Sequence, residues 1–295
     1  MRPVIIDSDI GDDITDTTAI IFALKSPELD IKALLSNNNH EKQRALILDK
    51  LVELAGKQIP VFQGVEGANG ALRAQKEFIE GYRGEVRKLE ENVGVVEKWL
   101  QRGALYLSDG TLTNVAYRLD RIPGTIKNTE FHVMAGAINR DYDGKNKPVS
   151  EWNIQCDVPS ARSFFAASLS VNLYPLDCSW DLEISDEQVE KIIKNPGPLN
   201  RALKEQFSTW REAHNRNLVE YDSLLVAAVI RPELITEWKE MKLKVNNHGQ
   251  TIQDSAGSTV RVALDADREE FTRFFMARMQ KSISDSGELI ENTSD

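Results

Sequence analysis

Through the first two thirds of the chain, short runs of β-branched and aliphatic residues alternate with segments in which apolar residues recur every three or four positions. The short runs predict strands and the periodic segments predict helices. The predicted strands are 4–6, 31–35, 60–63, 104–107, 131–134 and 171–176. The predicted helices between them are 17–25, 41–55, 85–101, 113–119 and 159–167. This βαβα order predicts an α/β fold with a mostly parallel open sheet flanked by helices.

In the last third of the chain, the pattern of apolar residues predicts helices first and strands later. We expect helices at 186–194, 199–213 and 223–229, strands at 242–246 and 259–263, and a final helix at 268–279. No internal repeat and no Pro- or Gly-rich linker divides the sequence. We therefore expect one domain over residues 1–282, followed by a polar, frayed tail over residues 283–295.

Composition narrows the class of protein and of partner. The 295 residues are 41% hydrophobic and 28% charged, which is ordinary for a globular protein with a full core. The net charge of -10 argues against a nucleic-acid partner and is compatible with divalent cations. The sequence has no long apolar run and no basic segment leading into one, so we expect a cytoplasmic protein with no membrane partner. The two cysteines are too few for a disulfide framework.

Five aspartates follow the first predicted strand within ten residues, in the stretch VIIDSDIGDDITD. In open α/β sheets, ligands bind beyond the carboxyl ends of the strands, and this stretch lies there. Several carboxylates in a small volume repel one another unless a proton or a cation neutralises them, and oxygen ligands suit Ca²⁺ or Mg²⁺. The alternative is that these acids only cap the following helix. The stretch by itself supports the two interpretations about equally.

The segment DSDIGDDITD resembles the opening signature of the inosine-uridine preferring nucleoside hydrolase family, in its DTDIGDDIDDA variant. Further segments resemble later landmarks of that family in the same order. They are DGTLTN at 109–114, VMAG at 133–136, EWNIQCD at 151–157, EYDSLLVAAV from 220 and VALDADREEF at 262–271. The resemblance covers nearly the whole chain, which makes chance agreement improbable.

This resemblance implies a Rossmann-like nucleoside hydrolase fold, a bound Ca²⁺, and hydrolysis of the N-glycosidic bond of ribonucleosides to free base and ribose. Asp9 would be a metal ligand and the general base that deprotonates a metal-bound water. Asp16 and Asp222 would complete the carboxylate ligands, and the backbone carbonyl of Asp109 would supply another oxygen. Asp7 is assigned to the same metal site, where it would hold the water or Asp9 by hydrogen bonds.

The resemblance also implies the residues that contact the substrate. Glu151 and Asn153 match positions that hydrogen-bond the ribose, and Met134 would pack nearby. One of the three asparagines at 37–39 would contact the substrate, and Asn39 is our first choice among them. Several aromatic residues are candidates for stacking on the base, namely Tyr82, Trp152, Trp180, Trp210 and Tyr221.

Two positions depart from the family pattern. Thr15 stands where the variant signature has an acid that contacts the ribose hydroxyls, and a hydroxyl cannot act as a charged acceptor. Tyr221 stands where many members have a histidine that is proposed to protonate the leaving base. The acid for the leaving group is therefore unassigned, although His214, shortly before Asp222, could reach the pocket.

These departures leave alternatives to a hydrolase of common ribonucleosides. The substrate could be a modified nucleoside or another N-riboside, such as nicotinamide riboside. The chain could also be a catalytically weak homologue that binds a nucleoside or a metal. The three intact carboxylates Asp9, Asp16 and Asp222 favour an active enzyme. Family members are usually dimers or tetramers, so we expect a homo-oligomer that acts on a small-molecule nucleoside.

Overall fold

The computed structural model describes residues 1–67, 75–147, 149–214, 216–283 and 289–290. Its first strand, β1 (Arg2–Ser8), is buried from Val4 onward. Val4 and Ile6 belong to one apolar cluster and Ile5 belongs to another, so the two faces of the strand are covered separately. A strand buried on both faces is typical of a parallel sheet with helices on either side.

The main sheet has nine strands in the order β10-β9-β11-β6-β5-β4-β1-β2-β3. All pairings between neighbours from β3 to β11 are parallel, whereas β9 runs antiparallel to both β11 and β10. Its strands after β1 are β2 (Leu29–Ser36), β3 (Val61–Phe62), β4 (Leu105–Ser108), β5 (Glu130–Met134), β6 (Ser170–Tyr174), β9 (Ile235–Val245), β10 (Thr251–Gln253) and β11 (Ser258–Ala266). The predicted α/β fold with a mostly parallel open sheet is therefore confirmed.

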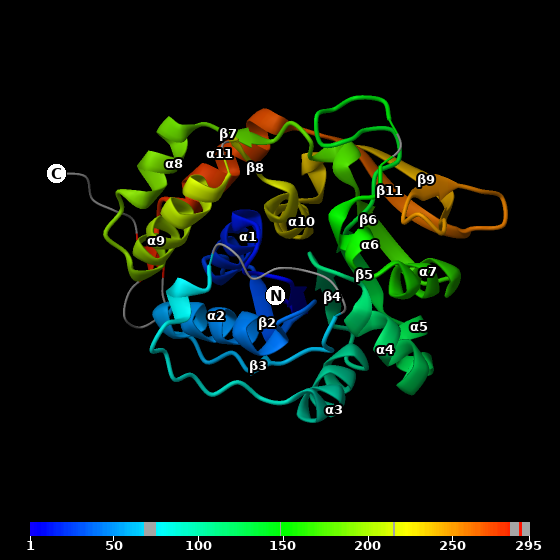
Figure 1. Cartoon of the computed structure of the whole chain (residues 1–295), viewed down its shortest axis with the longest axis horizontal. Helices are drawn as coiled ribbons and strands as arrows, with labels where there is room; N and C mark the ends of the chain where they lie inside the picture. The colour runs from blue at the N-terminus through cyan, green and yellow to red at the C-terminus, as the bar shows by residue number, and fades with distance from the viewer. Residues whose placement is uncertain (68–74, 148, 215, 284–288, 291–295) are drawn as a thin grey trace.

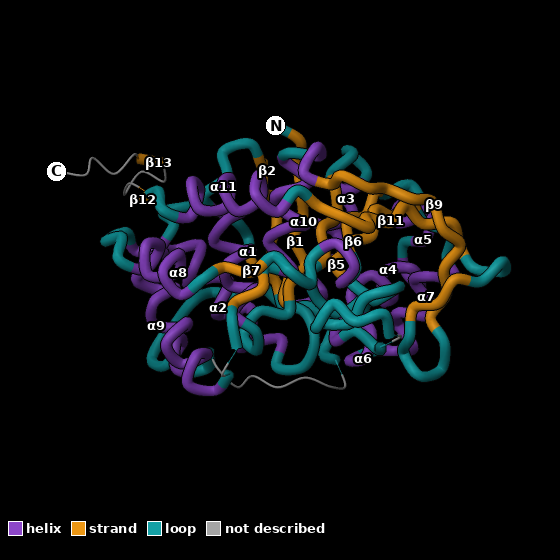
Figure 2. The backbone as a smooth tube through the Cα atoms, turned by 90° about the horizontal axis from the view of Figure 1, so that it is seen from above, coloured by secondary structure: helices purple, strands orange, loops and turns teal. Residues whose placement is uncertain are grey.

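Helices cover both faces of this sheet (Figure 1). One apolar cluster contains residues of α1 (Ile14–Leu24), α2 (Glu41–Leu54), α8 (Asp186–Ile193), α9 (Pro198–Ala213), α10 (Tyr221–Ile230) and α11 (Arg268–Met279). The other contains residues of α3 (Leu89–Leu100), α4 (Thr113–Arg121), α5 (Pro123–Lys127), α6 (Trp152–Cys156) and α7 (Val158–Ala166). Figure 2 shows α8 and α9 at one end of the molecule and the β9–β11 pair at the opposite end.

The strand order reverses between β1 and β4, which sets the place of the ligand site. From β1 the chain proceeds through β2 to β3 at one edge, and it then returns to the other side of β1 to form β4, β5 and β6. In open α/β sheets such a reversal leaves a crevice beyond the carboxyl ends of the two adjacent strands. The acidic stretch after β1 and residues 109–114 after β4 both begin at this crevice.

Several element boundaries differ from the predictions, and three elements begin three or more residues from the predicted position. The helix predicted to begin at residue 17 begins at Ile14, because Asp13 caps it. The helix predicted to begin at residue 85 begins at Leu89, because the backbone of Arg87 exchanges hydrogen bonds with Val61 and Gln63 beside β3. The strand predicted at 242–246 begins at Ile235, and its solvent-facing positions carry charged residues that obscure the apolar pattern.

The predicted frayed tail lies mostly outside the residues that the structure describes. Within its described part, β13 (Leu289–Ile290) pairs with β12 (Ser282–Ile283). A second small sheet pairs β7 (Glu183–Ile184) with β8 (Leu218–Val219). One domain over residues 1–282 stays a prediction. In the described ranges, no helix has the length and apolar character needed to cross a membrane.

Candidate active site

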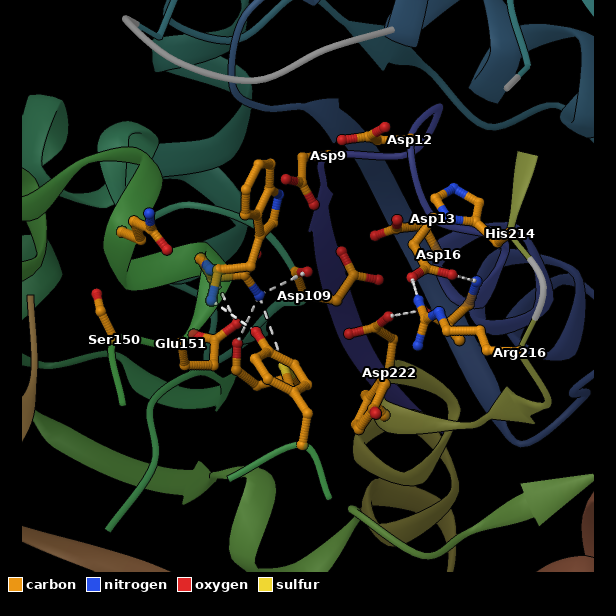
Figure 3. A pocket seen from close by; sticks show the side chains of 17 residues that line it. Asp9, Asp12, Asp13, Asp16, Asp109, Ser150, Glu151, His214, Arg216 and Asp222 are labelled. Carbon is orange, nitrogen blue, oxygen red and sulfur yellow. Dashed lines mark hydrogen bonds and ion pairs between the residues drawn. The ribbon is translucent and has the colours of Figure 1, made fainter. Parts of the chain in front are cut away.

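A cavity of about 430 Å³ opens at the reversal of strand order, and Figure 3 shows its lining. Seven acidic side chains line it: Asp9, Asp12, Asp13, Asp16, Asp109, Glu151 and Asp222. Three aromatic side chains also line it: Tyr142, Trp152 and Tyr221. The remaining lining residues are Thr15, Met134, Ser150, Asn153, Gln155, His214 and Arg216. The structure thus brings together residues that lie up to 213 positions apart in the sequence, from Asp9 to Asp222.

The loop after β1 and the first turn of α1 place acids by two different means. Asp13 is the N-cap of α1, and its Oδ1 accepts hydrogen bonds from the backbone N–H groups of Ile14 at 2.7 Å and Thr15 at 3.4 Å. Its other oxygen pairs with the guanidinium of Arg216. Asp16 lies one turn further and lines the cavity. Helix capping therefore accounts for Asp13 and leaves Asp16 available for a ligand.

Three carboxylates from β1, α1 and α10 repel one another across the cavity. Burial is the main reason that the pKa of Asp9, Asp16 and Asp222 is raised. The charges of Asp9 and Asp222 raise the pKa of Asp16 further, whereas Arg44 and Asn38 partly offset the effect of burial at Asp9. These three buried carboxylates can lie close together only if a proton or a cation neutralises part of their charge.

Thr15 forms a direct hydrogen bond with one of these carboxylates. Its hydroxyl donates a hydrogen bond of 2.6 Å to Oδ2 of Asp222, and both side chains are buried. The residue that departs from the family signature therefore contacts a predicted metal ligand.

Asp109 follows β4, and its carboxylate is buried without well-placed hydrogen-bond donors from the described part of the chain. It is 2% exposed, and among the residues that the structure describes no donor has hydrogen-bond geometry to either of its carboxylate oxygens, although Ser8 lies near enough to lower its pKa. Burial and the charge of Asp9 raise its pKa well above the usual range. The next residue must be glycine, because a Cβ at Gly110 would lie 2.8 Å from the backbone nitrogen of Asp9.

These groups fit a hard cation in chemistry. Buried, mutually repelling carboxylates and an unpartnered aspartate are the oxygen donors that Ca²⁺ takes. Across the described ranges, however, no three His, Cys, Asp or Glu side chains are grouped closely enough to hold one ion. An ion held by three of these side chains at once would therefore require them to turn toward one another from the positions seen.

Asp7 does not line the cavity. It is fully buried at the end of β1, where it accepts hydrogen bonds from Asn37 at 3.0 Å, Asn114 at 2.7 Å and the hydroxyl of Tyr106 at 2.5 Å. Burial raises its pKa to about 7 in spite of these donors. Its position fits the predicted supporting role behind Asp9 and does not place it in direct contact with a ligand in the cavity.

The three asparagines after β2 have distinct partners. Asn37 bonds to Asp7 and to Thr111. The amide of Asn38 donates to Oδ2 of Asp9 at 3.2 Å, and Asn38 has a left-handed backbone with φ of 65°. Asn39, our first choice for substrate contact, accepts the backbone N–H of His40 instead. None of the three asparagines lines the cavity, and Asn38 is the one that contacts Asp9.

The two residues predicted to bind ribose connect the ends of β4 and β5. Glu151 caps α6 and accepts backbone N–H groups of Gly136 at 2.9 Å and Asn153 at 2.8 Å. Burial raises its pKa to about 7. The amide of Asn153 donates to the carbonyl of Asp109 at 3.1 Å and to the carbonyl of Met134 at 3.0 Å.

The aromatic residues form a connected wall on the cavity. The ring of Tyr142 lies perpendicular to that of Tyr221, with centroids 5.8 Å apart, and its hydroxyl accepts the backbone N–H of Trp152 at 2.9 Å. Trp210 is instead fully buried in the core, and Tyr82 and Trp180 do not line this cavity. Tyr142 and Arg216 lie in irregular loops without a motif, so the sequence alone does not mark them as lining residues.

Comparisons with known proteins agree with this architecture. The family model described as inosine-uridine preferring nucleoside hydrolase matches residues 4–273. A pyrimidine-specific ribonucleoside hydrolase RihA of Salmonella enteritidis is 26% identical over 317 residues, covering 94% of this chain and 98% of the relative. RihA of Escherichia coli O7:K1 is 27% identical over 310 residues, with the same coverage.

Solved structures share the fold. A plant nucleoside hydrolase matches with a TM-score of 0.80 at 21% identity, covering 95% of this chain and 99% of that one. A purine-preferring ribonucleoside hydrolase from Gardnerella vaginalis matches with a TM-score of 0.78 at 20% identity, covering 95% and 98%. At these sequence identities the solved structures support the fold alone. The assignment to a family rests on the family model. This chain belongs to the inosine-uridine preferring nucleoside hydrolase family, a family of N-glycosidases.

Proposed function

We propose that the protein hydrolyses the N-glycosidic bond of ribonucleosides in a calcium-dependent reaction that gives free base and ribose. The observation that supports this most directly is the cavity itself. Carboxylates from α1, from α10 and from the residues directly after β1 and β4 surround one space at the carboxyl edge of the sheet, and the buried carboxylate of Asp109 is the least satisfied of them.

Asp9 would act as the general base. It lies at the end of β1 on the cavity, and burial favours its acceptance of a proton. Asn38 orients its carboxylate, and Arg44 holds its backbone carbonyl. A carboxylate that is fixed in this way can take the proton of an attacking water within hydrogen-bond reach.

The side chains of Asp9, Asp16 and Asp222 would hold the ion together with Asp109, through its carbonyl as the family resemblance implies or through its buried carboxylate. When bound, calcium would lower the pKa of water and orient the sugar hydroxyls. Asp7 would support Asp9 from behind, through the hydrogen bonds that fix the end of β1.

The rest of the lining would bind and polarise the substrate. Glu151 and Asn153 would contact the ribose, with Met134 packing against it. Departure of the base develops positive charge on the sugar, as in glycoside hydrolysis, and the surrounding acids stabilise that charge. Trp152 and Tyr221 would face the base. Assembly into dimers or tetramers stays a prediction from the family resemblance.

The test is ribose release from a panel of purine and pyrimidine ribonucleosides, followed with a reducing-sugar assay after treatment with a chelator and after readdition of Ca²⁺. Calcium-dependent release from at least one riboside is the expected result. If calcium binds and no riboside in the panel is cleaved, the protein is a binding homologue and the proposal is wrong.

A further inference from the structure

The described lining of the cavity carries an excess of negative charge. Among these described residues, seven acidic side chains face one arginine and one histidine. The arginine, Arg216, is already paired with Asp13. A bound calcium ion would offset two of the remaining charges, so a surplus of carboxylate would still face a substrate.

The aromatic lining adds a second, independent feature. Apart from Met1, the exposed large hydrophobic side chains of the described chain are Tyr142 at 39% and Trp152 at 42%. Both line this cavity, and Tyr221 packs edge-to-face against Tyr142. Aromatic faces attract cations, and the attraction increases where water is excluded. Acids and aromatic faces together are the chemistry that recognises a flat, positively charged ring.

The supply of proton donors supports the same conclusion. A neutral base usually needs a proton to leave. Among the described lining residues, His214 is the one histidine. Figure 3 shows it beside Asp13 and Arg216, on the opposite side of the cavity from Glu151. Glu151 itself accepts three backbone N–H groups.

We propose that the preferred substrates are ribosides whose base carries a permanent positive charge, such as an N-ribosylated pyridinium or an N-alkylated purinium ring. This inference rests on the proposed function and names the substrate class of that same site. In the reaction, a bond forms between the water oxygen and C1′ of the ribose, and the water proton goes to Asp9. The C1′–N bond breaks, and its electron pair stays on the ring nitrogen. The base therefore leaves as a neutral molecule without a proton from the enzyme.

Two measurements on the calcium-loaded protein test this preference. The first compares kcat/KM for nicotinamide riboside, uridine and inosine, each divided by its spontaneous rate of hydrolysis, because charged ribosides are intrinsically more labile. The second is independent of turnover and measures by calorimetry the binding of 1-methylnicotinamide and of neutral nicotinamide. We expect the charged ring to bind at least about tenfold more tightly.

Matched variants connect the preference to the cavity. Asp12→Asn removes one acid from the lining, and we expect it to reduce the ratio of charged to neutral affinity by roughly fivefold. Asp120→Asn makes the same change on the exposed surface of α4 and should leave the ratio unchanged.

The outcomes separate this inference from the proposed function. Equal affinities for the charged and the neutral ring would overturn the cationic preference and leave the hydrolase intact. The same conclusion would follow if the normalised rates for inosine or uridine matched that of the charged riboside and were lost in His214→Gln. Tighter binding of 1-methylnicotinamide without cleavage of any riboside would support the preference and overturn the proposed function.

Discussion

Replacing Asp7 by asparagine is expected to stabilise the calcium-free protein more at pH 8 than at pH 5. Asp7 is fully buried, and this burial outweighs the hydrogen bonds from Asn37, Asn114 and Tyr106 and the charge of Arg118, all of which favour its ionised form. The folded protein therefore holds the Asp7 proton to a higher pH than the unfolded chain does. Stability must then fall as the pH rises through this window, and a neutral amide at position 7 removes that loss.

The size of the effect follows from the raised pKa. Burial moves the pKa of Asp7 from 3.8 to about 7, and each unit corresponds to about 1.4 kcal/mol. At pH 8 the cost of ionising the folded protein is therefore about 4 kcal/mol relative to the unfolded chain. At pH 5 the folded protein keeps its proton while the unfolded chain loses its own, and the cost is about 2 kcal/mol.

Urea unfolding of wild type, Asp7→Asn and the surface control Asp120→Asn, in chelator at pH 5 and pH 8, measures this difference. The free energy of unfolding gained by Asp7→Asn should be about 2 to 3 kcal/mol larger at pH 8 than at pH 5. A gain that is the same at both pH values would refute the argument. Calcium affinity should also fall, by roughly tenfold or more, because loss of a residue that holds a metal ligand in place typically has an effect of this size. An unchanged affinity would show that Asp7 does not position Asp9.

Two further substitutions test the parts of the site that the structure newly defines. Thr15→Val removes the hydroxyl that donates to Asp222 and should raise the calcium concentration needed for half-maximal activity by roughly three- to tenfold; an unchanged requirement would show that this hydrogen bond does not position the ligand. Asn38→Ala should lower kcat by at least about tenfold with KM little changed, because the carboxylate of Asp9 loses its donor. Asn39→Ala is the matched control, and steady-state kinetics in which both variants behave alike would contradict this assignment.

The sequence could predict the site where it lies on regular elements and local motifs. The aspartates after β1, and Asp109 after β4, reach the cavity because parallel strands end at one edge of the sheet. The dual role of the acidic stretch also follows local rules, since Asp13 caps α1 while Asp16 lines the cavity. The boundary at Ile14 could have been derived from the Asp13 cap alone.

Other features depend on contacts between segments far apart in the sequence. The choice among three consecutive asparagines depends on a left-handed turn at Asn38, which periodicity does not reveal. Tyr142 and Arg216 reach the cavity from irregular loops, and their partners Trp152 and Asp13 come from other elements. In the sequence, Thr15 replaces an acid of the family signature. Its hydrogen bond to Asp222 could not be predicted, because it depends on the packing of α1 against α10.

The measurement that tests the central claim most directly is the turnover of Asp9→Asn at saturating calcium and nucleoside, alongside circular dichroism and calcium titration. The substitution is nearly isosteric, so the fold should persist while the amide can no longer accept the water proton. We expect kcat to fall by at least about a hundredfold with the spectrum of the folded protein unchanged. Turnover within twofold of wild type would contradict Asp9 as the general base and, with it, this account of the site.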